Sequence, residues 1–394
     1  MLNKITLKIL SVFAWIWSIE FVLNMLKEFF DIKIIWYSEI DKSAIQIYEK
    51  NFPWIPNLWD IKKINTSKIE DFDILVWWSP CQDFSISWKR KWLKWERGSL
   101  FFEFLRILKD KKPKFFIFEN VKWLISQNKW KDFQIILNEL ENAWYRVKYK
   151  VLNSNNFWLP QNRERVFIIG QRKDLWEFTY ELPITNWSKD VLLKDVIDNE
   201  FDEKYTKDIE IIKKLYSWKR DDQRCEHEDK ACYCLTRSWS PKWIIINKDI
   251  EFVKKYNYRK LSNLEELNDI KARQLSPEEY ERIQWFSTWF TSWVSDPQRY
   301  SLIWNSIAIN VLYEICKSLF TYIKDNKKLD TKVINNISNR SKKTNLSRYQ
   351  KEINEKREKF KNKDLFTLKD DVFTKLFDDL IEKRSKEIFG EINK

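Results

Sequence analysis

The sequence predicts an α/β fold built on a Rossmann-like, mostly parallel sheet, with a smaller part of different composition inserted later in the chain. Short apolar runs alternate with helix-length segments from residue 7 to residue 118, and each run ends in a polar loop. Residues 171–270 lack this alternation. A length of 394 residues and a hydrophobic content of 44% allow one large domain or two modest ones.

The elements are expected in a simple order. Ser18 is a candidate N-cap for a first helix that runs to about Phe30, and a second helix is expected from Leu100 to about Lys109. Ser276 and Pro277 predict the start of a later helix, because serine caps and proline suits the first helical position. The expected strands are 7–13, 32–36, 72–76 and 114–118, followed by a hairpin-like pair at 147–152 and 166–169.

Charge and cysteine content narrow the class of protein. The net charge of +13 favours a polyanionic partner. Five cysteines, an odd and sparse set, argue against a disulfide framework and fit a reducing cytoplasm. No apolar run is long enough to cross a membrane, so no membrane association is expected.

Five motifs follow the expected strands and helices in a fixed order. Cys81 lies in Ser-Pro-Cys-Gln-Asp-Phe-Ser, directly after the strand at 72–76, and Glu119 lies in Phe-Glu-Asn-Val after the strand at 114–118. Gln-Asn-Arg-Glu-Arg at 161–165, Arg-Ile-Gln at 282–284 and Asn-Ser at 305–306 come later. Together, over residues 7–320, these motifs resemble the C5-cytosine DNA methyltransferases. The resemblance implies a Rossmann-like S-adenosylmethionine-dependent methyltransferase sheet with a smaller, mostly irregular and β target-recognition domain.

Tryptophan stands where the family pattern has glycine, for example in Phe-Ala-Trp-Ile-Trp at 13–17 and in Trp77-Trp78 before the Cys81 motif. The chain has 23 Trp and 3 Gly, whereas average usage would give roughly 28 glycines. The codon UGA is read as tryptophan in some genetic codes and as glycine in others. We interpret the tryptophans as glycine codons read as tryptophan; the alternative is a genuinely tryptophan-rich protein.

The resemblance implies a catalytic set. Cys81 is the expected nucleophile, although a lone loop cysteine is more often an inert thiol. Glu119 is expected to protonate N3 of the cytosine, with its pKa raised by apolar neighbours; the alternative is a structural strand-end glutamate. Arg163 and Arg165 alternate with Glu164 and would share one face, where they orient Glu119 and the base. A surface ion-pair ladder is the alternative.

The cofactor implied is S-adenosylmethionine. Glu39 follows the second strand, where a carboxylate can accept from ribose hydroxyls, although a helix N-terminal acid is the alternative. The loop 13–17 would approach the methionine part of the cofactor, with Phe13 against adenine unless it is an ordinary core aromatic. The resemblance implies that Asp60 accepts from the adenine amino group; the alternative is a turn residue. The full set implied is Phe13, Ala14, Trp15, Ile16, Trp17, Glu39, Asp60, Ile61, Pro80, Leu100, Asn305 and Ser306.

Double-stranded DNA is the expected partner. The loop 85–99 is rich in lysine and arginine, which beside a nucleophile favours a phosphate-binding loop over a merely solvated surface. The expected DNA contacts are Gln82, Ser85, Ser87, Lys89, Arg90, Arg97 and Arg237.

The expected domains are a catalytic part at 1–175, a target-recognition domain at 176–272, a return segment at 273–325 that completes the catalytic domain, and a basic tail at 326–394 with a helix near its end. Cys225, His227, Cys232 and Cys234 are capable of binding zinc, but their spacing matches no standard finger, and no metal is expected.

The interpretation of the whole chain is a monomeric, cytoplasmic DNA (cytosine-5-)-methyltransferase that acts on a flipped cytosine in a specific duplex sequence. It would serve restriction-modification, with a cognate endonuclease, or act alone. The alternatives are a tRNA cytosine-5 methyltransferase, which shares the catalytic core, and a catalytically inactive DNA-binding relative. A recognition span of about 100 residues favours DNA.

Overall fold

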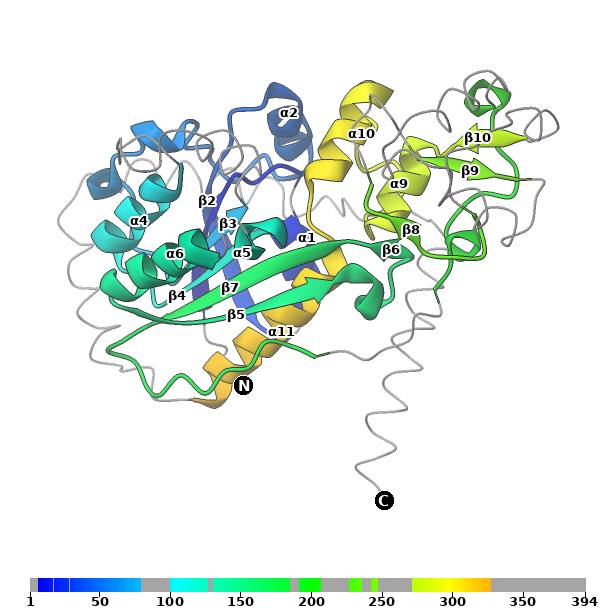
Figure 1. The fold of residues 1–394 in the computed structure, drawn as a ribbon. Helices are drawn as coiled ribbons and strands as arrows, with labels where there is room; N and C mark the ends of the chain where they lie inside the picture. The colour runs from blue at the N-terminus through cyan, green and yellow to red at the C-terminus, as the bar shows by residue number, and fades with distance from the viewer. Residues whose placement is uncertain are drawn as a thin grey trace.

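A six-stranded sheet lies at the centre of the computed structural model, which describes residues 6–16, 18–27, 29–78, 100–126, 130–184, 191–206, 227–235, 242–246 and 271–326 (Figure 1). The strand order is β2-β1-β3-β4-β7-β5. The first four strands pair in parallel, and β7 pairs antiparallel with both β4 and β5. The strands are β1 Thr6–Val12, β2 Asp31–Ser38, β3 Ile74–Trp78, β4 Phe115–Val121, β5 Tyr145–Asn153 and β7 Glu164–Arg172. The predicted α/β sheet is thus confirmed.

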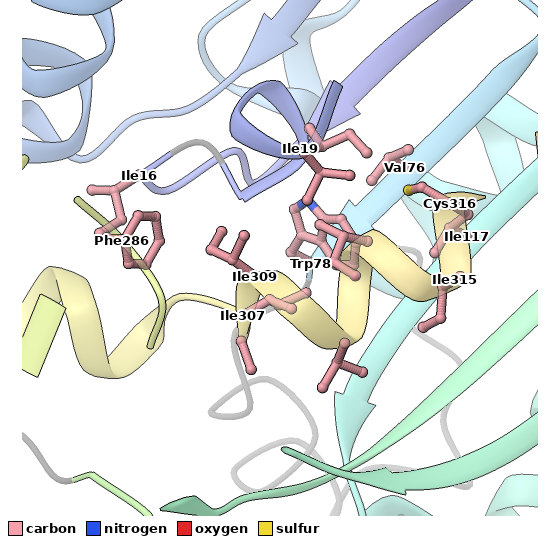
Figure 2. Packing of buried hydrophobic residues seen from close by; sticks show 14 of the residues in the cluster. Ile16, Ile19, Val76, Trp78, Ile117, Phe286, Ile307, Ile309, Ile315 and Cys316 are labelled. Atoms are coloured by element: carbon pink, nitrogen blue, oxygen red, sulfur yellow. The ribbon is translucent and has the colours of Figure 1, made fainter. Parts of the chain in front are cut away.

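Helices cover both faces of this sheet (Figure 1). Side chains alternate along each strand, so β3 directs Val76 and Trp78 to one face and Leu75 and Trp77 to the other. The first face packs against α1 and α11, where Trp78 lies among Ile19, Val76 and Ile309 (Figure 2). The second face packs against α4 and α6. The helices of this part are α1 Ser18–Leu26, α2 Lys42–Asn51, α4 Leu100–Lys111, α5 Trp123–Ser126, α6 Lys131–Asn142 and α11 Ile309–Asp325.

Short elements occupy the described parts of the segment between β7 and α11. There β9 (Trp243–Ile245) and β10 (Ala272–Gln274) form one small sheet, and β8 (Cys232–Tyr233) forms another with β6 (Gln161–Asn162), which lies just before β7 in the chain. The chain then passes through α9 (Pro277–Ile283) and α10 (Asp296–Asn305) and returns to the large sheet as α11.

Short 3-10 turns occur along the described parts of the chain. They are η1 Ile61–Lys63, η2 Thr66–Lys68, η4 Ser154–Phe157, η5 Leu193–Asp195 and η6 Glu203–Tyr205.

The start of α9 follows the prediction. The Ser276 hydroxyl accepts from the Glu279 amide at 3.1 Å, and the Glu279 carboxylate accepts from the Ser276 amide at 2.7 Å, with Pro277 as the first helical residue. The Glu279 carboxylate also forms a buried ion pair with Arg273 at 2.7 Å. This pair joins β10 to α9.

Two expectations for the first helix were wrong. Ser18 is the first helical residue instead of the cap, and its hydroxyl accepts from the Ile307 amide at 3.3 Å. The helix ends at Leu26 and not near Phe30, because Phe29 and Phe30 close a turn back onto the Leu26 carbonyl. This turn lets β2 begin at Asp31, opposite Thr6.

The backbone is left-handed at nine described residues that are not glycine. Phe13 and Lys112 are two of them, and the other seven are Trp15, Trp59, Trp130, Trp144, Trp158, Trp285 and Trp289. A side chain makes this conformation unfavourable by roughly 1–2 kcal/mol per residue, whereas glycine adopts it freely.

Among the described residues, no helix is both long and apolar enough to span a membrane. The C-terminal helix expected in the tail lies outside the described residues.

An acidic side chain is buried under the sheet beside two tyrosines. Glu20 on α1 accepts a hydrogen bond from the Tyr48 hydroxyl, and the Tyr48 ring stacks on Tyr37 with centroids 3.6 Å apart. Burial raises the pKa of the Glu20 carboxyl to about 7, although the Tyr48 hydrogen bond partly opposes this. The folded protein therefore binds a proton here more tightly than the unfolded chain does.

Glu20→Gln is expected to remove a pH dependence of stability. The contribution of Glu20 to the free energy of unfolding is full below pH 4.5 and is lost as pH rises through about 7, by about 3 kcal/mol in total, because Glu20 must then ionise while buried. Glutamine does not ionise. Urea unfolding across this range should show the decline in the parent and a smaller one in the variant.

Glu49→Gln is the matched control, since Glu49 is exposed on α2. It should keep the decline of the parent chain. Identical pH dependence in Glu20→Gln and the parent would contradict the assignment.

Candidate active site

The carboxyl ends of β3 and β4 bring the two central motifs together. Glu119 on β4 pairs in register with Trp78, the last residue of β3. The chain leaves β3 through Ser79 and Pro80 to Cys81, which lies outside the described residues. In parallel α/β sheets, ligands bind at this edge.

Glu119 is paired with an arginine in a buried setting. The Arg165 Nε lies 3.2 Å from Glu119 Oε1, and both side chains are mostly buried, at 13% and 8% exposure. Burial raises the pKa of the Glu119 carboxyl above its ordinary value, even though the charges of Arg165 and Arg163 oppose the rise. The site therefore favours the protonated carboxyl more than water does, as the sequence predicted.

Arg163 and Arg165 converge on the same place. Arg163 donates from one terminal nitrogen to the Ser306 carbonyl at 2.7 Å and from the other to Cys234 Sγ at 3.3 Å. Arg165 also approaches Cys234 Sγ, at 4.0 Å. Glu164 faces away and pairs with Lys122. The predicted shared face is thus observed, and the alternative of a surface ladder fits only Glu164.

Cys234 is a site residue that the sequence did not identify. Burial disfavours its thiolate, but the positive charges of Arg163 and Arg165 outweigh burial and lower its pKa below the ordinary value. In the sequence, Cys234 stood out only as one of four residues capable of binding zinc. Its actual neighbours are two arginines far away in the chain.

The strand that carries Cys234 toward the arginines is β8. Cys232 and Tyr233 pair in parallel with Gln161 and Asn162 on β6. The Cys232 amide donates to the Pro160 carbonyl at 2.8 Å, and the Leu235 amide donates to Gln161 Oε1 at 3.3 Å. Within the described ranges, no three potential metal ligands gather, and Cys225 lies outside them.

The loop after β1 faces the acidic end of β2. The Trp15 amide donates to Glu39 Oε2 at 3.1 Å, and Phe13 and Ala14 donate to the Ser38 carbonyl at 2.9 and 3.4 Å. Glu39 Oε1 accepts from the amides of residues 40 and 41. Burial raises the pKa of Glu39, and these amide hydrogen bonds oppose the rise. The carboxylate is therefore fixed in orientation at the loop.

The return segment closes the site from the other side. Asn305 ends α10, and Ser306 follows with its hydroxyl donating to the Ile303 carbonyl at 2.6 Å. The Ser306 carbonyl holds Arg163, while the next amide reaches Ser18. One short segment thus contacts both the start of α1 and Arg163.

The remaining predicted cofactor residues lie at the same edge. The Asp60 side chain caps η1 by accepting from the Lys62 amide at 3.0 Å, as a turn residue does. Ile61 is 3% exposed and packs in the apolar cluster of the second face. Leu100 begins α4 and is partly buried, and Ile16 is fully buried. The other predicted residues, Trp17, Pro80, Gln82, Ser85, Ser87, Lys89, Arg90, Arg97 and Arg237, lie outside the described residues.

Two of the residues at this edge, Glu39 and Phe13, fit parts of S-adenosylmethionine. A fixed Glu39 carboxylate suits hydroxyl donors, and Phe13 at the mouth of the loop suits a flat ring. The indole of Trp15 has no such complementarity, because close approach to this loop calls for glycine.

Solved structures share this fold. A DNMT2 mutant from Spodoptera frugiperda has a TM-score of 0.63 and 21% identity, covering 79% of this chain and 99% of that chain. The Entamoeba histolytica methyltransferase EhMeth has a TM-score of 0.65 and 20% identity, covering 81% and 99%. The chain therefore shares the fold of these methyltransferase structures.

Sequence comparison defines the family. The model of the C-5 cytosine-specific DNA methylase family matches residues 7–321. Type II methyltransferase M1.ScrFI of Lactococcus lactis subsp. cremoris is 34% identical over 75% of this chain and 74% of its own length. Type II methyltransferase M.NlaX of Neisseria lactamica is 33% identical over 79% and 96%. The chain belongs to the C-5 cytosine-specific DNA methylase family, and it is a DNA cytosine-5-methyltransferase that uses S-adenosylmethionine.

Cys234→Ala is expected to slow methyl transfer about tenfold, equivalent to about 1.4 kcal/mol of barrier, because Arg163 loses a half-buried partner and Glu119 loses its alignment. DNA affinity should change little. The variant and its control are made in a protein that carries glycine in place of the 23 tryptophans. Single-turnover rates then report methyl transfer, and DNA titrations report DNA affinity.

Cys316→Ala is the control, since it removes a buried thiol from the apolar face shown in Figure 2, away from the arginines, whereas Cys234 is half-buried. Loss of DNA affinity in Cys234→Ala with a normal saturating rate would place Cys234 in recognition and not in positioning.

Proposed function

We propose that this enzyme methylates a specific duplex sequence within a restriction-modification system, using Cys81, Glu119, Arg163 and Arg165 as its catalytic set. The observation that carries the proposal is the buried Glu119–Arg165 pair, 3.2 Å apart, at the strand edge from which the chain leads to Cys81. The type II names of the relatives favour the restriction-modification role.

The chemistry follows from what cytosine lacks. C5 is a poor nucleophile, so the Cys81 thiolate adds to C6 and the Glu119 carboxyl gives its proton to N3. This leaves C5 enamine-like. The cofactor supplies an electrophilic methyl group. Once C5 carries the methyl group, a solvent base takes the C5 proton, the Cys81 thiolate departs from C6, and N3 returns its proton to Glu119, which restores the aromatic ring.

The raised pKa of Glu119 supports its role as the proton donor. Arg165 fixes one carboxylate oxygen, and Arg163, held by the Ser306 carbonyl and Cys234, places a second positive charge nearby. Both arginines can hold the flipped base and Glu119 in one geometry. A base buried in duplex DNA must leave the stack to reach this edge.

Substrate contacts complete the proposal. The cofactor is bound by the set of residues that the sequence predicted, of which the structure describes Phe13, Glu39, Asp60, Ile61, Leu100 and Ser306 among others. The basic loop 85–99 closes on DNA phosphates through Ser85, Ser87, Lys89, Arg90 and Arg97, with Gln82 and Arg237 as further contacts. The domain division at 175, 272 and 325, a monomeric state, a cytoplasmic location and a cognate endonuclease belong to the same proposal.

Trapping with 5-fluorocytosine tests the nucleophile. Duplex DNA synthesised with 5-fluorocytosine should form a denaturant-resistant adduct with the glycine-encoded enzyme, because fluorine does not leave as a proton does. Cys81→Ser should form no adduct while still binding DNA, and Cys316→Ala should form it normally. An adduct that persists in Cys81→Ser would refute the assignment.

A further inference from the structure

We propose that the tryptophans of this chain are glycine in the protein as its own cells make it, and that the backbone itself marks seven of them: Trp15, Trp59, Trp130, Trp144, Trp158, Trp285 and Trp289. These residues have φ between 43° and 77°. Tryptophan makes up 23 of 394 residues, so chance would place it at fewer than one of the nine left-handed positions. Glycine is the residue that adopts this region without steric cost.

Three of the seven lie where a helix or a 3-10 turn ends. Trp144 follows the C-cap of α6, and its amide donates to the Glu141 carbonyl at 3.1 Å. Trp285 follows the C-cap of α9, and its amide donates to the Arg282 carbonyl at 2.9 Å. Trp158 is the C-cap of η4, with φ 59°. A left-handed residue just past a helix is the position that glycine occupies most often.

Tryptophan makes only peripheral contacts at the exposed turns: the Trp130 ring meets Phe133 edge-on at 6.0 Å, and Lys173 and Arg299 lie over the Trp144 and Trp289 rings at 5.7 and 5.8 Å. Trp59, Trp130, Trp144 and Trp289 are 57%, 46%, 61% and 55% exposed. A ring of this size in a turn leaves apolar surface in water and strains the backbone at the same time. Loss of the ring at these positions removes little buried contact.

Buried tryptophans carry a different mark. Among the residues that the structure describes, the indole Nε1 atoms of Trp77, Trp78 and Trp304 are buried and have no hydrogen-bond partner. Buried indole N–H groups normally find an acceptor, because an unpaired donor is costly away from water. The surroundings of these three rings therefore offer no acceptor for an indole N–H group.

The substitution matters most at the strand-end site. The Trp77 ring lies 4.8 Å from the Phe13 ring, centroid to centroid, and Trp15 sits in the loop whose amide binds Glu39. Glycine at 15 and 77 frees the space beside Phe13. This last consequence rests on the proposed cofactor role of Phe13, whereas the identity of the residues does not.

Backbone strain is separable from ring loss by comparing two variants of the full chain. One carries glycine at the seven left-handed positions, and the other carries alanine at the same positions. Both lose the rings, but only glycine relieves φ. The urea midpoint of the glycine variant should exceed that of the alanine variant, and equal midpoints would overturn the backbone argument.

Peptide mass spectrometry of the protein isolated from the cells that carry its gene decides the residue identity. We expect glycine in the peptides that cover positions 15, 77, 144 and 285. Tryptophan in those peptides would overturn the proposal. The readout does not depend on activity, so it is distinct from failure of the 5-fluorocytosine adduct, which would count against the catalytic assignment alone.

Discussion

The buried pair of Glu119 and Arg165 is the interaction on which the site depends. A carboxyl group at the end of an apolar strand is costly unless a cation lies beside it, and the antiparallel pairing of β4 with β7 supplies one. Arg165 also approaches Cys234 Sγ, which accepts a hydrogen bond from Arg163, and Arg163 donates to the Ser306 carbonyl. Cys234 and Ser306, which are far from the arginines in sequence, are thus both tied to one charged cluster.

Much of this architecture is predictable from local signals. Apolar runs of strand length predicted β1, β2, β3 and β4 along the chain, and Ser276 followed by Pro277 predicted the start of α9. Glu119 was identified through the family resemblance, and the shared face of Arg163 and Arg165 followed from their alternation with Glu164. Long-range partners were not predictable, because no local pattern encodes them. Cys234 lies 71 positions from Arg163, and Ser18 lies 289 positions from Ile307.

At several turns the backbone conformation calls for a different residue from the one in the sequence. Gly170 is one of only three glycines, and a Cβ there would lie 1.9 Å from the ring of Phe116. At that position the sheet already has the residue it requires. At Trp15, Trp144 and Trp285 the backbone requires the same freedom, but the chain carries the largest side chain. Strain of this kind would fall on the turns that place the active site.

Bisulfite sequencing of DNA from a host that expresses the glycine-encoded gene tests the central claim most directly. The enzyme should protect cytosines from conversion on both strands within one recurring short sequence, because methyl transfer occurs at C5 of a specific target. A Cys81→Ser version should leave every cytosine convertible. Complete conversion of host DNA despite soluble expression of the intact glycine-encoded enzyme would contradict the account.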